Sequence, residues 1–275
     1  MDRRVLILAL DGLEYDLVIR WRLRNLMQVR YGVFKSDISP HFKKPHTPML
    51  WASFITGKDP KEHGVDEWWR WNPLLEKIRW LPPFKWIKGK RRLLEKLGIK
   101  PKPSLKTLNI ETIFDIVKPS IAIDVPTWSM DVSKRFRMIE SIMKKNVDAL
   151  IENVWKRHRE KVEELYNSLD KEWRLLMVWF DIADILGHVC ISMCRPQLLK
   201  CYLELDRLVK NLRDRLDSDT FILVVSDHGM KPMPDGTGDH SEYGFWSINR
   251  DYSWFNPQRI TDFYHLILRV LSVQK

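Results

Sequence analysis

The sequence has few cysteines and no long hydrophobic run, and each absence excludes a class of protein. Only 3 of the 275 residues are cysteine, and Cys190, Cys194 and Cys201 lie close together. An odd, clustered set argues against a disulfide framework and is typical of a reducing compartment. No apolar run approaches the roughly 18 residues of a membrane span, and the run at 5–10 is too short for a signal peptide. We therefore expect a soluble, cytoplasmic protein.

An excess of one sign of charge is also missing outside a single segment. The formal net charge is +10, from 46 Lys and Arg against 36 Asp and Glu. Segment 67–106 carries 12 basic and 3 acidic residues, a net of +9, which leaves 34 basic and 33 acidic residues elsewhere. The isoelectric point of about 9.4 therefore describes one segment and does not indicate that the whole chain binds nucleic acid. With 44% hydrophobic residues the chain can bury a core, which excludes a disordered protein.

Strand-like and helix-like patterns alternate along the chain. Five apolar, β-branched runs predict strands, at 5–10, 32–38, 121–125, 175–180 and 221–226. Three of these runs are nearly continuous, as in strands buried on both faces of a parallel sheet. Helical patterns follow at 133–169, as one or two helices, at 196–216 and at 261–271. This alternation predicts a single α/β domain over residues 1–275, a three-layer α/β/α sandwich with a mostly parallel central sheet.

Segment 67–106 interrupts this alternation. It holds five of the 13 tryptophans, at positions 68, 69, 71, 80 and 86, together with five prolines. We interpret the segment as a basic insertion that forms a cap on the α/β domain. Two roles remain open: it contacts a substrate, a nucleic acid or an anionic surface, or its tryptophans only cover apolar core.

Asp and His residues follow the ends of the predicted strands, where functional groups gather in open α/β sheets. They are Asp11, Asp184, His188, Asp227, His228 and, in a later glycine-rich loop, His240. Carboxylates and neutral imidazoles are ligands for Zn²⁺, or for Mn²⁺ where oxygen dominates. Asp181 competes with Asp184, but only Asp184 has a histidine four residues later, on the same helical face. Cys190 and Cys194 lack the spacing of a thiolate metal site, so we place them on a helix face.

One further stretch makes the pattern similar to a known family. Thr47 stands ten residues before Gly57, and Pro60-Lys61-Glu62-His63-Gly64 follows. Together with the Asp and His motifs, in this order, the sequence resembles the alkaline phosphatase superfamily. It is most similar to the type I phosphodiesterase/nucleotide pyrophosphatase branch, including its short archaeal-type members. His63, in the His-Gly turn of that motif, is interpreted as structural.

The resemblance implies a site with two divalent metal ions, Zn²⁺ with Mn²⁺ as the alternative. One ion would be bound by Asp184, His188 and His240. The other would be bound by Asp11, Asp227 and His228, with the oxygen of Thr47, the implied nucleophile, completing its shell. Three carboxylates and one threonine alkoxide carry four negative charges, which balance two divalent ions.

The function that the resemblance implies is metal-dependent hydrolysis of phosphodiester or pyrophosphate bonds in small, nucleotide-type substrates. A phosphomonoesterase of the same superfamily is the first alternative. The second is a non-catalytic module that binds nucleic acid or an anionic surface through 67–106. Sulfatases are excluded because the chain lacks their Cys-x-Pro-x-Arg sequence. The phosphoglycerate and phosphopentose mutases carry a large inserted domain for which 275 residues leave little space.

Overall fold

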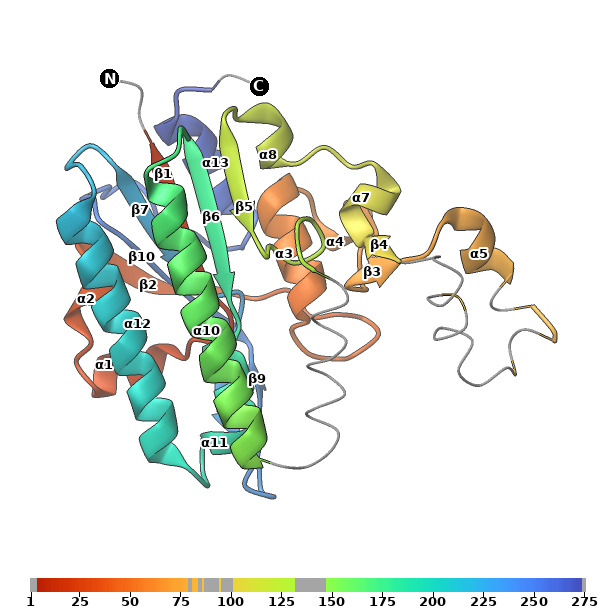
Figure 1. The fold of residues 1–275 in the computed structure, drawn as a ribbon, viewed down its shortest axis with the longest axis horizontal. Helices are drawn as coiled ribbons and strands as arrows, with labels where there is room; N and C mark the ends of the chain where they lie inside the picture. The colour runs from red at the N-terminus through yellow and green to blue at the C-terminus, as the bar shows by residue number, and fades with distance from the viewer. Residues whose placement is uncertain are drawn as a thin grey trace.

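The structure is a computed structural model, which describes residues 4–78, 81–83, 86, 94, 101–131 and 147–273. Its centre is a six-stranded sheet with the order β2-β10-β7-β1-β6-β5 (Figure 1). These strands are β1 (Val5–Leu10), β2 (Arg30–Lys35), β5 (Ser120–Ile123), β6 (Leu175–Phe180), β7 (Phe221–Val225) and β10 (Tyr243–Ile248). Neighbouring strands are parallel except at β10, which is antiparallel to β7 and to β2. The predicted mostly parallel α/β fold is confirmed.

The sheet differs from the sequence prediction at one edge. Strand β10, which was not predicted, lies between β7 and β2. Its run contains Gly244 and Ser247, which break the apolar pattern. Both are nevertheless buried, because Phe34 packs where a side chain at position 244 would lie and the Ser247 hydroxyl donates to the carbonyl of Leu26. Strand β2 also ends three residues earlier than the predicted run at 32–38.

Helices cover both faces of the sheet, which explains the continuous apolar runs. Side chains Leu6, Leu8 and Leu10 of β1 pack on one side and Val5, Ile7 and Ala9 on the other. The first face carries α1 (Tyr15–Arg20), α2 (Arg24–Met27), α10 (Val147–Leu169), α11 (Ile182–Cys190) and α12 (Arg195–Arg215). The second carries α3 (Thr47–Thr56), α7 (Ser104–Leu108), α8 (Ile113–Ile116) and α13 (Asp262–Val270).

The two longest helices are amphipathic. Helix α10 buries positions 150, 154, 158, 161, 165 and 169, which follow the i, i+3, i+4 pattern of one face. It accounts for the described part of the predicted helical segment 133–169, whose residues 133–146 lie outside the described ranges. Helices α12 and α13 match the other two predicted segments within a residue. Among the helices that the structure describes, none has both the length and the apolar character needed to cross a membrane.

Two short strands, β3 (Trp69–Arg70) and β4 (Lys102–Pro103), pair antiparallel at the base of segment 67–106. Helix α5 (Pro73–Ile78) lies beyond this pair, away from the central sheet (Figure 1). Trp71 is buried, whereas Trp86 is 69% exposed. Trp80 and most of 84–100 lie outside the described residues. The role of a cap stays a prediction.

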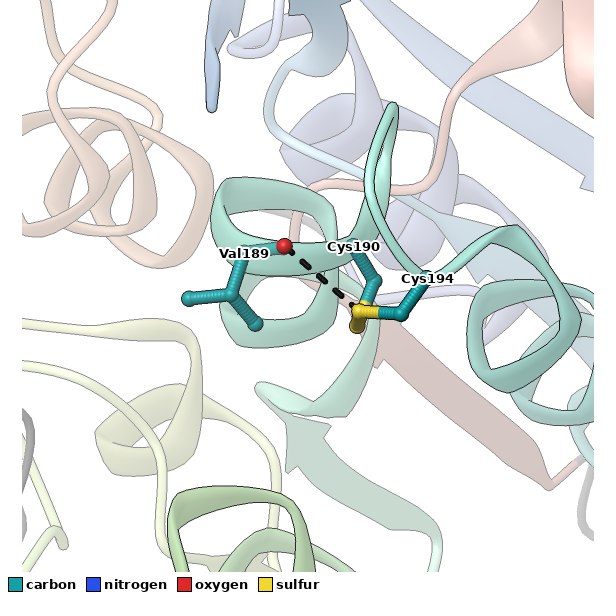
Figure 2. Close-up of a disulfide and its surroundings, with 3 residues drawn as sticks. All are labelled: Val189, Cys190 and Cys194. Atoms are coloured by element: carbon teal, nitrogen blue, oxygen red, sulfur yellow. Dashed lines mark hydrogen bonds between the residues drawn. A yellow bond between two sulfur atoms is a disulfide. The ribbon is translucent and has the colours of Figure 1, made fainter. Parts of the chain in front are cut away.

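The expectation about the cysteines is wrong for two of the three. Cys190 and Cys194 form a disulfide (Figure 2). Helix α11 ends at Cys190, and the turn that follows brings Cys194, the residue before α12, to a Cα–Cα distance of 4.2 Å. The two cysteines therefore do not share the face of one continuous helix, as expected, but close a turn between two. Cys201 is free and buried. The cytoplasmic location, which rested on unpaired cysteines, stays a prediction.

One buried histidine on α10 makes the stability of this fold sensitive to acid. His158 is 3% exposed, its ring centroid lies 5.2 Å from that of Phe180, and neither ring nitrogen has a hydrogen-bond partner among the described residues. Burial, aided by the nearby Lys161 charge and opposed by Asp181, lowers the pKa of His158 to about 4. The folded state therefore resists protonation at a pH where the unfolded chain accepts it.

We expect this histidine to destabilise the fold as the pH falls. Its pKa is lower in the folded than in the unfolded chain, so the contribution is fully present above about pH 6.5 and is lost towards pH 4. At 1.36 kcal/mol per pKa unit the loss reaches about 3 kcal/mol. Urea unfolding of the parent and of His158→Leu at pH 7, 5.5 and 4.5 measures it. The variant should show a flatter pH dependence; identical slopes would contradict the assignment.

Candidate metal centre

Three central strands end at the same edge of the sheet. Strand β1 lies between β6 and β7, and in these parallel ladders Leu10 is opposite Phe180. One residue further, the Asp11 amide donates to the Phe180 carbonyl at 2.9 Å. Strand β7 ends at Val225, and Asp227 follows two residues later, at the same level as Asp11. Figure 1 shows α11 and β9 (Gly238–Ser241) at this end of the sheet.

A glycine lets the first loop approach helix α11. Gly12 has a φ of +69°, and a Cβ there would lie 2.5 Å from the Cα of Asp184. Only glycine fits this contact and this left-handed backbone. Asp184 lies in the first turn of α11, and His188 lies one turn later. The close approach brings the carboxylates of Asp11 and Asp184 to one site.

Backbone carbonyls orient the three histidine rings. The Nδ1 atoms of His188, His228 and His240 lie 2.8, 3.0 and 2.8 Å from the carbonyl oxygens of Gly238, Gly229 and Pro45, respectively. A carbonyl accepts only, so each Nδ1 carries a proton and donates it. Each Nε2 then faces the site, as in histidines that bind metal ions.

The first predicted ligand set comes together in the structure. Asp184 Oδ1 lies 3.3 Å from His188 Nε2 and 3.5 Å from His240 Nε2, and the two nitrogens lie 3.2 Å apart. Two nitrogens bound at 2.0–2.1 Å to a tetrahedral ion are about 3.3 Å apart. The spacing therefore fits a shared metal ion.

The second set is gathered in a different combination. The ligand atoms of Asp11, Asp184 and His228 lie within 4.8 Å of one another, so Asp184 belongs to both ligand groups in the described part of the chain. Asp11 Oδ1 lies 3.3 Å from His228 Nε2. Asp227, predicted in this set, has an oxygen 3.6 Å from the same nitrogen. Asp184 thus stands between the two sets.

The carboxylates of this site lack partners for their oxygens. Both oxygens of Asp11, both of Asp227 and one of Asp184 are buried and accept no hydrogen bond among the described residues. Burial and the Asp11 charge raise the pKa of Asp227 well above its usual value. Burial alone would lower the pKa of His228, but Asp227 and Asp11 raise it to about 10. In the protein without metal ions, protons bound by Asp227 and His228 offset part of the negative charge of the carboxylates. Divalent ions bound among the same side chains would offset it instead.

Thr47 lies against this cluster. It is the first residue of α3, is 3% exposed, and its Oγ1 lies 3.3 Å from His228 Nε2. The amino end of a helix favours negative charge because its first N–H groups point outward. A phosphoryl group beside Thr47 would therefore lie near a partial positive charge.

Two other residues have structural partners. Asp181, the competitor of Asp184, pairs with Arg157 and Lys161 at 2.9 and 3.3 Å. His63 accepts the Val65 amide at Nδ1, 3.0 Å, and so donates from Nε2 to Ser53 Oγ, 2.9 Å. His63 therefore links the turn after α4 (Pro60–His63) to α3, as its structural interpretation predicts.

Sequence comparison finds one family over most of the chain. A family model described as type I phosphodiesterase/nucleotide pyrophosphatase matches residues 5–245. The catalytic subunit of GPI ethanolamine phosphate transferase 3, from human and from mouse, is 34% identical over 79 residues. That match covers 28% of this chain and 7% of each relative, so the chain spans only a small part of their length.

Solved structures share the fold at low sequence identity. Human ectonucleotide pyrophosphatase/phosphodiesterase 5 matches with a TM-score of 0.56 and 12% identity, over 98% of this chain and 95% of its own. The murine protein, as an inactive threonine-to-alanine variant in complex with AMP, gives 0.52 and 14% over 99% and 96%. A Mg-bound mutant of TAB5 alkaline phosphatase gives 0.50 and 11% over 99% and 98%.

Fold and family match together define an alkaline phosphatase superfamily protein. Within that superfamily, the chain belongs to the type I phosphodiesterase/nucleotide pyrophosphatase family.

Replacement of Asp227 tests, without any substrate, whether the buried carboxylates carry an unbalanced negative charge. In metal-free protein at pH 8, Asp227→Asn should raise the free energy of unfolding by on the order of 1–2 kcal/mol, because it removes a repelled, buried carboxylate. The same variant should bind Zn²⁺ more weakly. Urea unfolding in a chelator and zinc titration measure the two effects.

Asp181→Asn is the matched control, since this carboxylate also follows a central strand but has cationic partners. It should lower the free energy of unfolding by about 1–3 kcal/mol and leave zinc affinity unchanged. Destabilisation of the metal-free protein by both variants would contradict the charge argument.

Proposed function

We propose that this protein hydrolyses phosphodiester or pyrophosphate bonds in nucleotide-type substrates, with Thr47 as nucleophile and two divalent ions, Zn²⁺ or Mn²⁺. The observation that carries the proposal is the position of Thr47 Oγ1, 3.3 Å from His228 Nε2 beside carboxylates without partners. Asp184, His188 and His240 would hold one ion, and Asp11, Asp227 and His228 the other. When bound, the ions supply Lewis-acid stabilisation of the attacking and leaving oxygens.

In the proposed reaction, bonds to phosphorus form and break in two successive displacements. Thr47 Oγ1 loses its proton to a water molecule and attacks phosphorus, and the substrate oxygen on the opposite side leaves with the electron pair of the broken P–O bond and takes up a proton. Water then breaks the threonine–phosphorus bond and restores the hydroxyl. Burial of Thr47 at the amino end of α3 excludes bulk water from the attacking oxygen and places helix N–H groups near the phosphoryl oxygens.

The relatives support this choice of substrate and nucleophile. The murine structure holds AMP, a nucleotide, and is inactive with alanine in place of one threonine. The human relative is named a pyrophosphatase and phosphodiesterase. A nucleotide-type diester in this chain agrees with both.

We further propose that segment 67–106 selects the substrate as a cap. Its net charge of +9 would attract phosphate groups over a range of about 8 Å at physiological salt. Trp86, which is exposed, offers a flat surface to a base.

Replacement of Thr47 tests the nucleophile. Thr47→Ala should lower kcat for bis-p-nitrophenyl phosphate by at least about 1,000-fold, or roughly 4 kcal/mol in the barrier, while Thr47→Ser keeps measurable turnover. A chelator should abolish activity in the parent, and Zn²⁺ or Mn²⁺ should restore it. Turnover by Thr47→Ala within about tenfold of the parent would favour attack by water. Faster hydrolysis of p-nitrophenyl phosphate than of the diester would instead favour a monoesterase.

Charge removal tests the cap. Replacing Arg70, Lys102 and Lys106 together with Ser should raise KM for a nucleotide diester several-fold and weaken its dependence on salt. KM for bis-p-nitrophenyl phosphate, which offers no base and fewer charges, should change little. Equal losses on both substrates, accompanied by a lower Tm, would mean that the segment only covers the core. Tight binding of single-stranded nucleic acid without turnover would favour the non-catalytic alternative.

A further inference from the structure

Glu14, three residues after Asp11, lies between the loops that carry the metal ligands. It precedes α1, and its amide donates to the hydroxyl of Tyr202 on α12 at 2.7 Å. Its Oε2 accepts the Met230 amide at 2.7 Å and the Ser241 hydroxyl at 3.0 Å. One carboxylate oxygen thus joins the first loop to both strands of the β8–β9 hairpin, in which β8 is Gly229–Pro232.

The Glu14 contacts are made by residues that are next to, or two residues from, the predicted metal ligands His240 and His228. In the β8–β9 ladder Met230 is opposite His240, and Ser241 follows His240. His228 is two residues before Met230. The Glu14 contacts therefore set where both histidines stand relative to Asp11.

Gly229 offers an independent sign that the carboxylate is built into the fold. A Cβ at position 229 would clash with Glu14 Oε2 and with Ser241 Oγ. The glycine that follows the Asp-His pair therefore provides the space that Glu14 occupies. The hairpin is shaped around this side chain.

We propose that Glu14 is a positioning residue for the metal centre: it holds the hairpin that carries His240, and the loop that carries His228, against the Asp11 loop. It binds no ion and touches no substrate. The inference rests on the proposed metal-dependent function. Removing the side chain leaves the Met230 amide without its acceptor and lets the hairpin move away from Asp11 and Asp184.

Zinc affinity of the full chain, measured by competition with a chromophoric chelator, tests the proposal. Glu14→Ala should weaken binding 10–100-fold, the range for residues that orient metal ligands. Glu14→Gln should stay within about threefold of the parent, because its carbonyl oxygen still accepts from Met230 and Ser241, and only the exposed hydrogen bond from the Asp16 amide is lost. In metal-free protein, hydrogen exchange at the Met230 amide should be faster in Glu14→Ala than in the parent. That readout requires neither metal nor turnover.

Asp206 provides a matched control on the same face of the sheet. Its carboxylate accepts from the amides of Asn25 and Leu26, both at 2.9 Å, and so joins α12 to α2 away from the site. Asp206→Ala should lower Tm but leave zinc affinity and Met230 exchange unchanged. This separates positioning from general destabilisation. Should Glu14→Ala fail to fold, Ser241→Ala, which removes one of the two contacts, should weaken zinc binding several-fold.

The outcomes separate the two proposals. A parent protein that binds no divalent ion would overturn the proposed function and this inference with it. A parent that binds zinc, together with unchanged affinity and Met230 exchange in Glu14→Ala, would overturn the role of Glu14 alone. If Ser241→Ala carries the test, its unchanged zinc affinity would have the same meaning.

Discussion

Repulsion among three buried carboxylates is the constraint around which this molecule is organised. Asp11, Asp184 and Asp227 are buried together, and most of their oxygens accept no hydrogen bond within the described structure. Charges removed from water are tolerated only with compensating charge close by. Protons can supply part of it, as the raised pKa values of Asp227 and His228 indicate. Divalent ions would supply it without neutralising the ligands, so metal binding and stability are coupled here.

The parallel sheet makes this concentration of charge possible. Strands β7, β1 and β6 are central and are buried on both faces, so their ends cannot move apart to relieve the repulsion. The remaining ligands come from α11, which Gly12 approaches closely at Asp184, and from β9, where Ser241 donates to Glu14. The Ser226 hydroxyl also joins the loops after β1 and β7, because it accepts the Leu13 amide at 2.9 Å and donates to the His228 carbonyl at 2.6 Å. Because the core strands are fixed by packing, the ligands at their ends are also held in fixed positions.

Elements whose burial requires a recognisable pattern of apolar residues could be predicted from the sequence. Features that depend on loop geometry could not. Strands β1 and β6 have the predicted bounds because burial on both faces requires an unbroken apolar run. Strand β10 was missed because Gly244 and Ser247 interrupt its run, and only contacts distant in sequence bury them. The motifs pointed to Asp and His residues that lie together at the strand ends, but not to the position of Asp184 in both ligand groups. The disulfide and the Glu14 contacts depend on turns, which no pattern of residue types reveals.

Charge balance at the site also bears on the substrate. With the two divalent ions that we propose, the three carboxylates would leave one net positive charge while Thr47 is protonated, and a phosphodiester monoanion would neutralise it. A phosphomonoester dianion leaves an excess negative charge and needs a further cation. Lys44 pairs with Asp239, the residue before His240. A second negative charge would have to be met from elsewhere, and segment 67–106 holds the largest local excess of positive charge. Charge balance at the proposed two-ion site thus agrees with the diester that we propose, and a more highly charged substrate would depend on the proposed cap.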